Sequence, residues 1–313
     1  MFLQNKIKNS TRVGLLKKAI NKKGYVKIME VHDGLSALIA NSSKIIKNNI
    51  AYNFDGFWAS SLTDSASKGL PDIELVNLDS RLNMIRQITE VVPKPIVVDG
   101  DTGGDLDHFG YFINRFENAG VSMVIIEDKI FPKRNSFSKS QQNLEDIDVF
   151  SEKIKRGISK KLDTDFMLVA RLESLIAGET VMQACKRAKA YLEAGADGIM
   201  IHSKSKTPLE ILEFSKLYYQ FPKNLIENKV LVCAPTTYNL ITSEELARQG
   251  FNIIIYSNHQ LRAAYVAMQN VCKSILLHDR GFEAEKMCIP FNKLFETVGM
   301  LEVVKTDKAK GKQ

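Results

Sequence analysis

Cysteine is scarce in this chain, with four residues among 313. Cys185, Cys233, Cys272 and Cys288 lie far apart and form no CxxC pair. Neither a zinc ligand pattern nor a disulfide framework is therefore indicated. We expect reduced thiols packed within the fold.

Long apolar runs are also missing. No window approaches the roughly 18 consecutive apolar residues that a membrane-spanning helix requires. The first ten residues, MFLQNKIKNS, lack the apolar core and small-residue cleavage site of a secretory signal. These absences predict a soluble cytoplasmic protein with no membrane partner.

The net charge of +7 is concentrated at the two ends of the chain. Residues 1–24 contain seven Lys/Arg and no acid, and residues 305–313 contain four Lys and one Asp. The +7 of the whole chain less the +10 of these ends leaves −3 for residues 25–304. We expect no nucleic-acid partner, because few aromatic residues accompany the cations. Residues 1–24 should form a basic helix with a solvated or subunit-contacting face, and residues 305–313 a disordered tail.

What the sequence does contain is a strand pattern that recurs eight times. The runs are 25–33 (YVKIMEVHD), 54–62 (FDGFWASSL), 94–104 (KPIVVDGDTGG), 121–129 (VSMVIIEDK), 165–174 (DFMLVARLES), 195–204 (GADGIMIHSK), 229–236 (KVLVCAPT) and 251–259 (FNIIIYSNH). Helical patterns separate them, for example 180–197, which stops at Gly195, and 242–250, which opens with a capping-box order.

Strand and helix in alternation predict an α/β fold, a (β/α)8 barrel over residues 25–280. The continuous Val/Ile runs fit a sheet that is covered on both faces. An open doubly wound sheet is the rival fold, but it normally carries GxGxxG after its first strand, and EVHDGLSA does not.

Helical patterns also follow the eighth strand. Residues 259–277 form one, and residues 289–300 form another with an apolar stripe of Phe291, Leu294, Phe295 and Val298. The extension 281–304 should therefore pack on another element, and a neighbouring subunit is one candidate.

Carboxylates stand at the predicted strand ends, where barrel enzymes place their reacting groups. Asp99 and Asp101 are two residues apart, so their side chains point to the same side. Two like charges so close require a neutralising cation, and Mg²⁺ prefers such oxygen ligands. Glu127 on the next strand and Asp72, after the second strand, would complete the set.

More ordinary roles remain open for these residues. Asp99 and Asp101 could cap the next helix. Arg171 and His202 end apolar runs and could bind carboxylate or phosphate oxygens. Arg171 could instead form a salt bridge with Glu173 or Glu127, and His202 could be a packing histidine.

Six segments in order, WASSL, DGDTGG, EDKIFPKRNS, ARLESLIAG, IHSK and NHQLRA, resemble the phosphoenolpyruvate mutase branch of the isocitrate lyase superfamily. The similarity runs from about residue 25 to about residue 300, and EDKxFPKxNS is a specific motif. The resemblance implies an Mg²⁺-dependent isomerase that interconverts phosphoenolpyruvate and phosphonopyruvate in phosphonate biosynthesis. It also implies a homodimer or homotetramer in which the last barrel helix is exchanged between subunits.

The resemblance also implies roles for individual residues. Asp99 would bind Mg²⁺ directly, while Asp72, Asp101 and Glu127 would hold its waters. The substrate carboxylate would be held by Ser60, Ser61 and Leu62, after Trp58, largely through backbone N–H groups. A gating loop, residues 129–142, would carry Lys133 and Asn135. The phosphoryl group in transfer would be held by Asn135, Arg171 and His202, and Asp72 and Lys133 would belong to the catalytic set.

Related reactions differ in this loop. Carbon–carbon lyases of the superfamily carry a catalytic Cys there, and residues 127–145 contain none. Phosphonopyruvate hydrolases tend to carry Thr where this chain has Asn135, so Asn135 favours the mutase and leaves the hydrolase as the alternative. DGDTGGDLDHF departs from the DTGYGN of many relatives, so Gly104, Asp105 and His108 could line a mouth of different shape.

Two rivals lie outside this family of reactions. A Schiff-base aldolase would use Lys129 or Lys204 as its nucleophile. A degenerate barrel serving as a sensor or scaffold would have lost the ligands. Asp64, Asp107 and His108 have no assignable role, and a solvated face is the default expectation for each.

Overall fold

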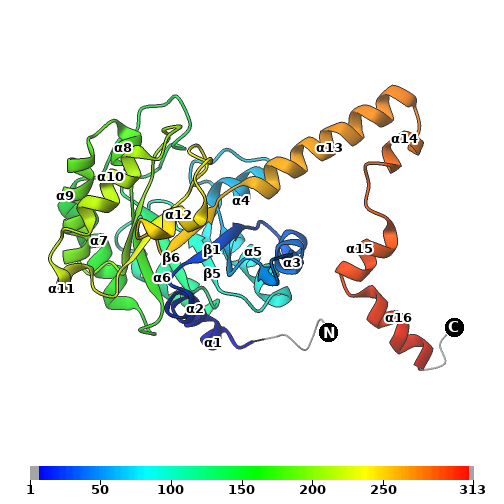
Figure 1. Ribbon diagram of the computed structural model, residues 1–313, viewed down its shortest axis with the longest axis horizontal. Helices are drawn as coiled ribbons and strands as arrows, with labels where there is room; N and C mark the ends of the chain where they lie inside the picture. Colours follow the sequence, from blue (N-terminus) through cyan, green and yellow to red (C-terminus); the bar gives the residue numbers. More distant parts are fainter. Residues whose placement is uncertain (1–6, 310–313) are drawn as a thin grey trace.

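A computed structural model describes residues 7–309. Eight parallel strands close into a barrel in the order β1-β10-β9-β8-β7-β6-β5-β4, with β4 pairing back to β1 (Figure 1). They are β1 (Val26–Glu30), β4 (Gly56–Ala59), β5 (Ile96–Asp99), β6 (Met123–Glu127), β7 (Met167–Leu172), β8 (Gly198–Ile201), β9 (Val230–Cys233) and β10 (Ile253–Tyr256). Each lies within one of the eight predicted runs, so the predicted barrel is confirmed.

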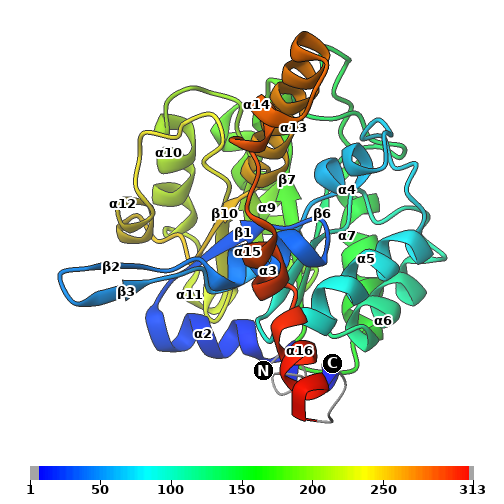
Figure 2. The same ribbon diagram turned by 90° about the vertical axis from the view of Figure 1, so that its right-hand side faces the viewer.

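Helices follow the strands, and most of them cover the outside of the barrel (Figure 2). They are α3 (Gly34–Ser42), α4 (Ser61–Ser67), α5 (Leu78–Val91), α6 (Phe109–Asn118), α7 (Ile147–Lys160), α8 (Ser174–Ala177), α9 (Val181–Glu193), α10 (Leu209–Tyr218), α11 (Lys223–Ile226) and α12 (Ser243–Arg248). The predicted helices at 180–197 and 242–250 are α9 and α12, and α12 begins with the expected capping box of Thr242 and Glu245. Gly195, the predicted stop, has a φ of +104°, which glycine adopts without a Cβ clash.

Successive side chains of each strand alternate between the barrel interior and the layer under the helices. On β6, Met123 and Ile125 belong to the interior cluster, whereas Val124 and Ile126 pack with the helices. The alternation therefore places Glu127 on the interior side at the C-terminal end of the strand. The same period places three more polar side chains there: Asp99 after Val97, Arg171 after Val169, and His202 after Met200.

The basic N-terminal segment forms two short helices, α1 (Asn9–Val13) and α2 (Leu15–Lys23), where one helix was predicted. The two meet at Gly14, where a Cβ would lie 2.8 Å from a carboxylate oxygen of Asp165. Arg12 is buried, and its guanidinium donates to the carbonyl oxygens of Val92 and Lys94 at 2.7 and 2.8 Å. This cation ties the segment to the barrel, so Arg12 does not belong to the solvated or subunit-contacting face expected of residues 1–24. Residues 1–6 lie outside the described residues.

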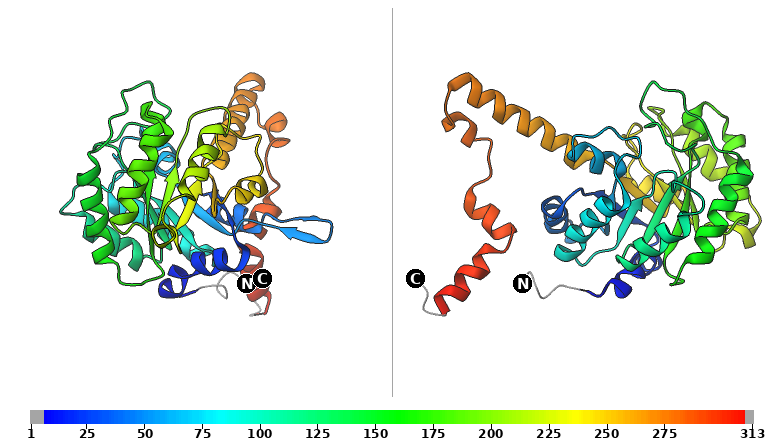
Figure 3. Two further views of the ribbon diagram at one scale, coloured as in Figure 1. Left: turned by 60° about the vertical axis from the view of Figure 1, so that its left-hand side comes forward. Right: turned by 180° about the vertical axis from the view of Figure 1, so that it is seen from behind.

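One element is absent from the sequence-based prediction. Strands β2 (Ile45–Lys47) and β3 (Ile50–Tyr52) form an antiparallel hairpin between α3 and β4. The hairpin projects from the barrel (Figure 3), and Ile45, Ile46 and Ile50 are exposed. Each of its strands is only three residues long, which is too short for an alternating pattern to stand out.

The C-terminal helices form an arm that leaves the barrel (Figure 1). It comprises α13 (His259–His278), α14 (Phe282–Glu285), α15 (Phe291–Thr297) and α16 (Met300–Ala309). The predicted helix 259–277 is confirmed as α13, in which no residue is buried. The predicted helix 289–300 is interrupted, because Gly299 takes a φ of +81° between α15 and α16.

Helix α16 continues through Ala309, which corrects the expected disordered tail for residues 305–309; residues 310–313 lie outside the described part. Between residues 7 and 309, none of the helices is both long and apolar enough to cross a membrane. Exchange of the arm between subunits stays a prediction.

Candidate active site

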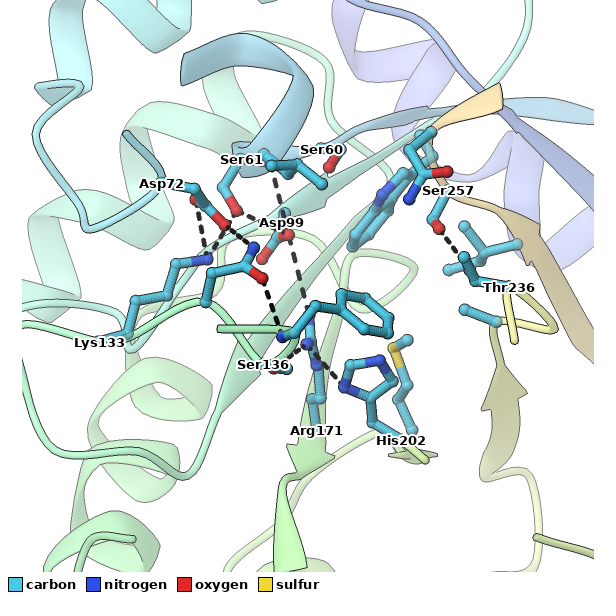
Figure 4. Close-up of a pocket in the computed structure, with 18 residues that line it drawn as sticks. Ser60, Ser61, Asp72, Asp99, Lys133, Ser136, Arg171, His202, Thr236 and Ser257 are labelled. Carbon is cyan, nitrogen blue, oxygen red and sulfur yellow. Dashed lines mark hydrogen bonds and ion pairs between the residues drawn. The ribbon is translucent and has the colours of Figure 1, made fainter. Parts of the chain in front are cut away.

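A cavity of about 50 Å³ lies at the C-terminal ends of the barrel strands (Figure 4). These predicted site residues line it: Trp58, Ser60, Ser61, Leu62, Asp72, Asp99, Lys133, Asn135, Arg171 and His202. The other two predicted residues, Asp101 and Glu127, are buried and interact with Lys133 and Arg171, which line the cavity. The structure thus brings the whole predicted set together, and the roles assigned to its members stay predictions.

Lys133 lies at the centre of the acidic group. Its Nζ is 2.6 Å from Asp101 Oδ1 and 3.1 Å from Asp72 Oδ1, and it donates to Ser61 Oγ at 2.8 Å. Ser61 Oγ donates in turn to Asp99 Oδ2 at 2.9 Å. Burial by itself would lower the pKa of Lys133, but the surrounding carboxylates, Asp101 foremost, raise that pKa well above its usual value. A lysine therefore supplies positive charge where a metal ion was expected.

Asp101 is held by a second buried cation. Arg81, on α5, places Nη2 2.6 Å from Asp101 Oδ2, and its Nη1 donates to the carbonyl oxygen of Asp99. Burial would raise the pKa of Asp101, but the charges of Arg81 and Lys133 outweigh burial and lower it. The capping alternative is not supported, since α6 begins only at Phe109.

No group of three or more His, Cys, Asp or Glu side chains within residues 7–309 converges as a ready metal-ligand cluster. Among the same residues, however, neither oxygen of Glu127 accepts a hydrogen bond, nor does one oxygen each of Asp72 and Asp101. Lys133 is within ion-pair distance of the latter two, but not in hydrogen-bonding geometry. Buried carboxylate oxygens without hydrogen-bond donors are stabilised by a cation, which is Lys133 at Asp72 and Asp101 in this structure, and such hard oxygen ligands also suit Mg²⁺. The donor set therefore fits this ion in chemical type.

Glu127 is the least well neutralised of these acids. Its Oε2 is 3.3 Å from Arg171 Nη2, and its Oε1 is 3.8 Å from Lys129 Nζ. Burial raises the pKa of Glu127 to about 7, against the opposing charges of Arg171 and Lys133. A nearby positive charge would therefore act strongly on this carboxyl group.

Glu173 organises the opposite side of the cavity. Its Oε1 lies 2.5 Å from Arg171 Nε and 2.7 Å from His202 Nδ1, and its Oε2 lies 2.9 Å from Lys129 Nζ. Burial would raise the pKa of Glu173, but these hydrogen-bonding and cationic partners, Arg171 foremost, hold it well below its usual value. The alternative of a salt bridge from Arg171 to Glu173 and Glu127 is thus confirmed, and it leaves Arg171 at the cavity wall.

His202 Nδ1 also lies 2.9 Å from Arg171 Nη2, but one ring nitrogen cannot donate to Glu173 and accept from Arg171 at once. Donation to the carboxylate is the stronger interaction. Burial and the charge of Arg171 lower the pKa of His202, which favours the neutral ring with its proton on Nδ1. Glu173 therefore orients both cavity side chains.

Residues 129–142, the predicted gating loop, lie folded over the cavity. Asn135 Nδ2 donates to Asp72 Oδ2 at 2.7 Å, and Ser136 Oγ donates to Glu173 Oε2 at 2.6 Å. Phe137 contacts the ring of His202 edge-on, at 5.8 Å between centroids. The loop is closed in this structure, because it bonds to both sides of the cavity.

Comparison with known proteins gives the same assignment as the motifs. A family model described as phosphoenolpyruvate phosphomutase matches residues 16–276. The chain belongs to the phosphoenolpyruvate phosphomutase family. It is 36% identical over 285 residues to the phosphoenolpyruvate phosphomutase of Streptomyces hygroscopicus, covering 90% of this chain and 86% of that protein.

Two further relatives carry the other reaction name. The phosphonopyruvate hydrolase of Variovorax sp. (strain Pal2) is 37% identical over 259 residues, covering 82% of this chain and 86% of that protein. A solved phosphonopyruvate hydrolase in complex with oxalate and Mg²⁺ matches with a TM-score of 0.82 at 32% identity, covering 96% of this chain and 99% of that chain. Membership of the superfamily is therefore established, and overall identity does not separate mutase from hydrolase.

The two lysines that a Schiff-base aldolase would use, Lys129 and Lys204, both interact with other groups of this protein. Lys129 Nζ is buried against Glu173, and Lys204 Nζ donates to the carbonyl oxygen of Ile176 at 3.1 Å. A Schiff-base lysine must present its amine to the substrate, and neither of these two lysines lines the active-site cavity.

Several residues near the site escape prediction from sequence. Ser136 and Glu74 lie in loops, where no periodic pattern indicates which side chains are buried. Arg81 lies in α5, and the helical periodicity of α5 is the one sequence signal that it is buried. Gly104, Asp105 and His108 line a second cleft of about 460 Å³, which adjoins the site through Asp101 and Arg81 but is not the active-site cavity. Asp64, expected on a solvated face, is buried beside Lys68, whereas exposed Asp107 pairs with Arg156 at 2.6 Å.

Proposed function

We propose that this protein is an Mg²⁺-dependent phosphoenolpyruvate phosphomutase that interconverts phosphoenolpyruvate and phosphonopyruvate. One observation carries the proposal: Lys133 and Asn135, both on the closed loop, bond to Asp72 across a small cavity that also contains Arg171 and His202. Moving a phosphoryl group from oxygen to carbon requires that water be kept away during the transfer. A closed polar cavity suits that requirement.

Each side of the cavity has a distinct part in this proposal. Arg171, His202 and Asn135 hold the phosphoryl group as it moves between the enol oxygen and C3 of the pyruvate fragment. A dianionic phosphoryl group favours the protonated form of His202, which then donates from both ring nitrogens. Ser60, Ser61 and Leu62 hold the substrate carboxylate beside Trp58.

Asp99 would hold Mg²⁺, with Asp72, Asp101 and Glu127 around it, and the ion would stabilise negative charge on the enolate oxygen. The solved hydrolase relative in complex with oxalate and Mg²⁺ supports this assignment. The buried oxygens of Glu127 that accept no hydrogen bond support it independently.

Phosphonopyruvate hydrolase is the second candidate, favoured by the 37% identity to the Variovorax enzyme. Starting from phosphonopyruvate, both reactions first break the bond between carbon and phosphorus. The phosphoryl group is then transferred to the enolate oxygen in the mutase reaction or to water in the hydrolase reaction. Asn135, in place of the Thr that the resemblance associates with hydrolases, supports the mutase. The absence of Cys from residues 127–145 speaks against a carbon–carbon lyase.

Phosphorus NMR of the purified protein with phosphonopyruvate and Mg²⁺ separates these candidates. We expect a phosphoenolpyruvate signal to grow as phosphonopyruvate disappears. Inorganic phosphate as the sole product would replace the mutase by the hydrolase. No turnover in the presence of Mg²⁺ would overturn both.

We further propose that the C-terminal arm joins subunits into a homodimer or homotetramer. No residue of α13 is buried, and Leu276 and Leu277 are 84% and 79% exposed. Apolar side chains on such a helix are ordinarily covered by another element. Light scattering coupled to size-exclusion chromatography should give a multiple of the 35.2 kDa chain mass, and a monomer at micromolar concentration would contradict the proposal.

A further inference from the structure

Glu74, in the loop between α4 and α5, joins three segments that meet at the site. Its Oε1 accepts hydrogen bonds from the backbone N–H and the Oγ1 hydroxyl of Thr102, at 3.0 and 2.8 Å. Its Oε2 accepts from the backbone N–H of Lys133 at 2.7 Å. One carboxylate thus links its own loop, the segment after β5 and the gating loop.

Two acids therefore hold opposite ends of Lys133. Glu74 binds the backbone N–H, and Asp101 binds the side-chain Nζ. Both acids have left-handed backbones, with φ of +62° for Glu74 and +53° for Asp101. Such conformations cost free energy in residues other than glycine and persist where the surrounding contacts impose them. The shared strain indicates that the position of Lys133 is closely determined.

We propose that Glu74 is a positioning residue that latches the gating loop closed by fixing the backbone of Lys133 to Thr102. The residues from 130 to 143 form neither helix nor strand, so their closed position depends on bonds of this kind. Hydrogen bonds to a charged acceptor are stronger than those between neutral groups. The effect that we expect on turnover rests on the proposed function. The effect that we expect on the position of the loop does not depend on it.

The latch requires acceptors on both sides of the Glu74 side chain. Thr102 and Lys133 both present backbone N–H donors to it. In Glu74→Gln, an isosteric change, one end of the side chain becomes an NH₂ group that faces a donor. A residue that merely fills space tolerates this change, whereas a latch does not.

Limited proteolysis with trypsin measures how accessible the loop is, because the exposed residues Arg134 and Lys139 are cleavage sites within it. Cleavage rates are compared for wild type, Glu74→Gln and Glu74→Ala, each with Mg²⁺ and oxalate. The matched control is Glu90→Gln, the same charge change at an exposed position on α5. We expect about tenfold or faster loop cleavage in both Glu74 variants than in the control, and a fall of about 10- to 100-fold in kcat/KM.

Equal cleavage rates for Glu74→Gln and Glu90→Gln, with equal thermal unfolding midpoints, would overturn the latch. If wild type does not turn over phosphonopyruvate but the Glu74 variants are still cleaved faster, the latch stands and the proposed function fails. Should the Glu74 variants not fold, Thr102→Val removes the hydroxyl that donates to Glu74 and accepts from the Gly104 N–H, and it leaves the backbone N–H donor of residue 102 in place. It should then raise loop cleavage by about two- to tenfold, and no increase would overturn the latch.

Discussion

The two sides of the cavity are both built from buried charges, but they obtain their positive charge differently. Asp72 and Asp101 are paired with Lys133, which arrives on the gating loop. Glu173 is paired with Arg171, on β7, and with Lys129, which the bridge to Leu144 holds at the base of the loop. The acidic side therefore takes part of its positive charge from the predicted gating loop, besides Arg81 on α5, whereas the opposite side takes it from Arg171 on β7 and from Lys129 at the base of that loop.

This difference couples the charge of the site to the position of the loop. In the proposed opening of the loop, Lys133 would leave and Asp72 and Asp101 would lose one counterion, which would make them a better site for a divalent cation. Glu173 would keep its contacts with Arg171 and His202, so these two groups would remain oriented, whereas Asn135 would move with the loop. Closure of the loop and metal binding should then oppose one another when no substrate is bound. A negatively charged substrate between Lys133 and the metal ion should reduce this opposition or reverse it.

Removal of Asp99, whose sole ion-pair partner among residues 7–309 is Arg171 at 3.9 Å, should have the largest effect. Asp99→Ala should abolish Mg²⁺ binding and lower kcat by about 10³-fold or more, because metal stabilisation is worth several kcal/mol. Calorimetric titration with Mg²⁺ and the phosphorus NMR assay measure the two quantities. Wild-type turnover in this variant would refute the metal role, and chelation of wild type with EDTA should reproduce the loss.

Lys133→Ala tests the cation on the predicted gating loop. It should lower kcat/KM by about 10²- to 10³-fold, since the closed loop would bury Asp72 and Asp101 with less compensation. Global stability in urea should change by less than about 1 kcal/mol, because the proposed opening of the loop would let water reach the acids. Lys139→Ala, exposed in the same loop, is the control and should keep wild-type activity. A large loss of stability in Lys133→Ala would break the comparison.

Glu173→Gln tests the other side of the cavity and should behave in the opposite way. It should lower the free energy of unfolding by about 3 kcal/mol, because Arg171 and Lys129 cannot withdraw. The pKa of Glu173 is held below its usual value, so its stabilisation is present above the ordinary Glu pKa and is lost as the pH falls through the lowered one. Urea unfolding at pH 7 and at pH 3 should therefore show a gap between wild type and variant that narrows in acid. A gap that widens in acid would contradict this assignment.

Asn135 joins the loop to the acidic side through Asp72 and should give the smallest of these effects. Asn135→Ala should lower kcat by about 10- to 100-fold, as expected for one lost donor to a developing charge, with Mg²⁺ affinity and folding retained. Asn135→Thr sharpens the result, because we expect it to raise the share of inorganic phosphate among the products. Unchanged kcat in Asn135→Ala would remove this residue from the proposed mechanism.

Much of the site followed from local rules. Period-two alternation after Val97, Ile125, Val169 and Met200 is enough to aim Asp99, Glu127, Arg171 and His202 into the barrel mouth. The hairpin at 45–52 and the break at Gly299 could not be found in this way, because neither has a strong pattern of hydrophobicity. Arg81 and Glu74 were missed for another reason: their partners lie 20 and 59 residues away along the chain.

Sequence alone determined the barrel, its eight strands and the identity of the side chains at their ends, since these depend on periodicity and on the order of residues along each strand. Only the tertiary structure decided which charges meet. Lys133 reaches Asp72 and Asp101, and Glu173 gathers Arg171, Lys129 and His202, because barrel closure and loop folding bring distant segments within a few ångströms. Electrostatic energies depend on those distances and on burial, and a sequence records neither.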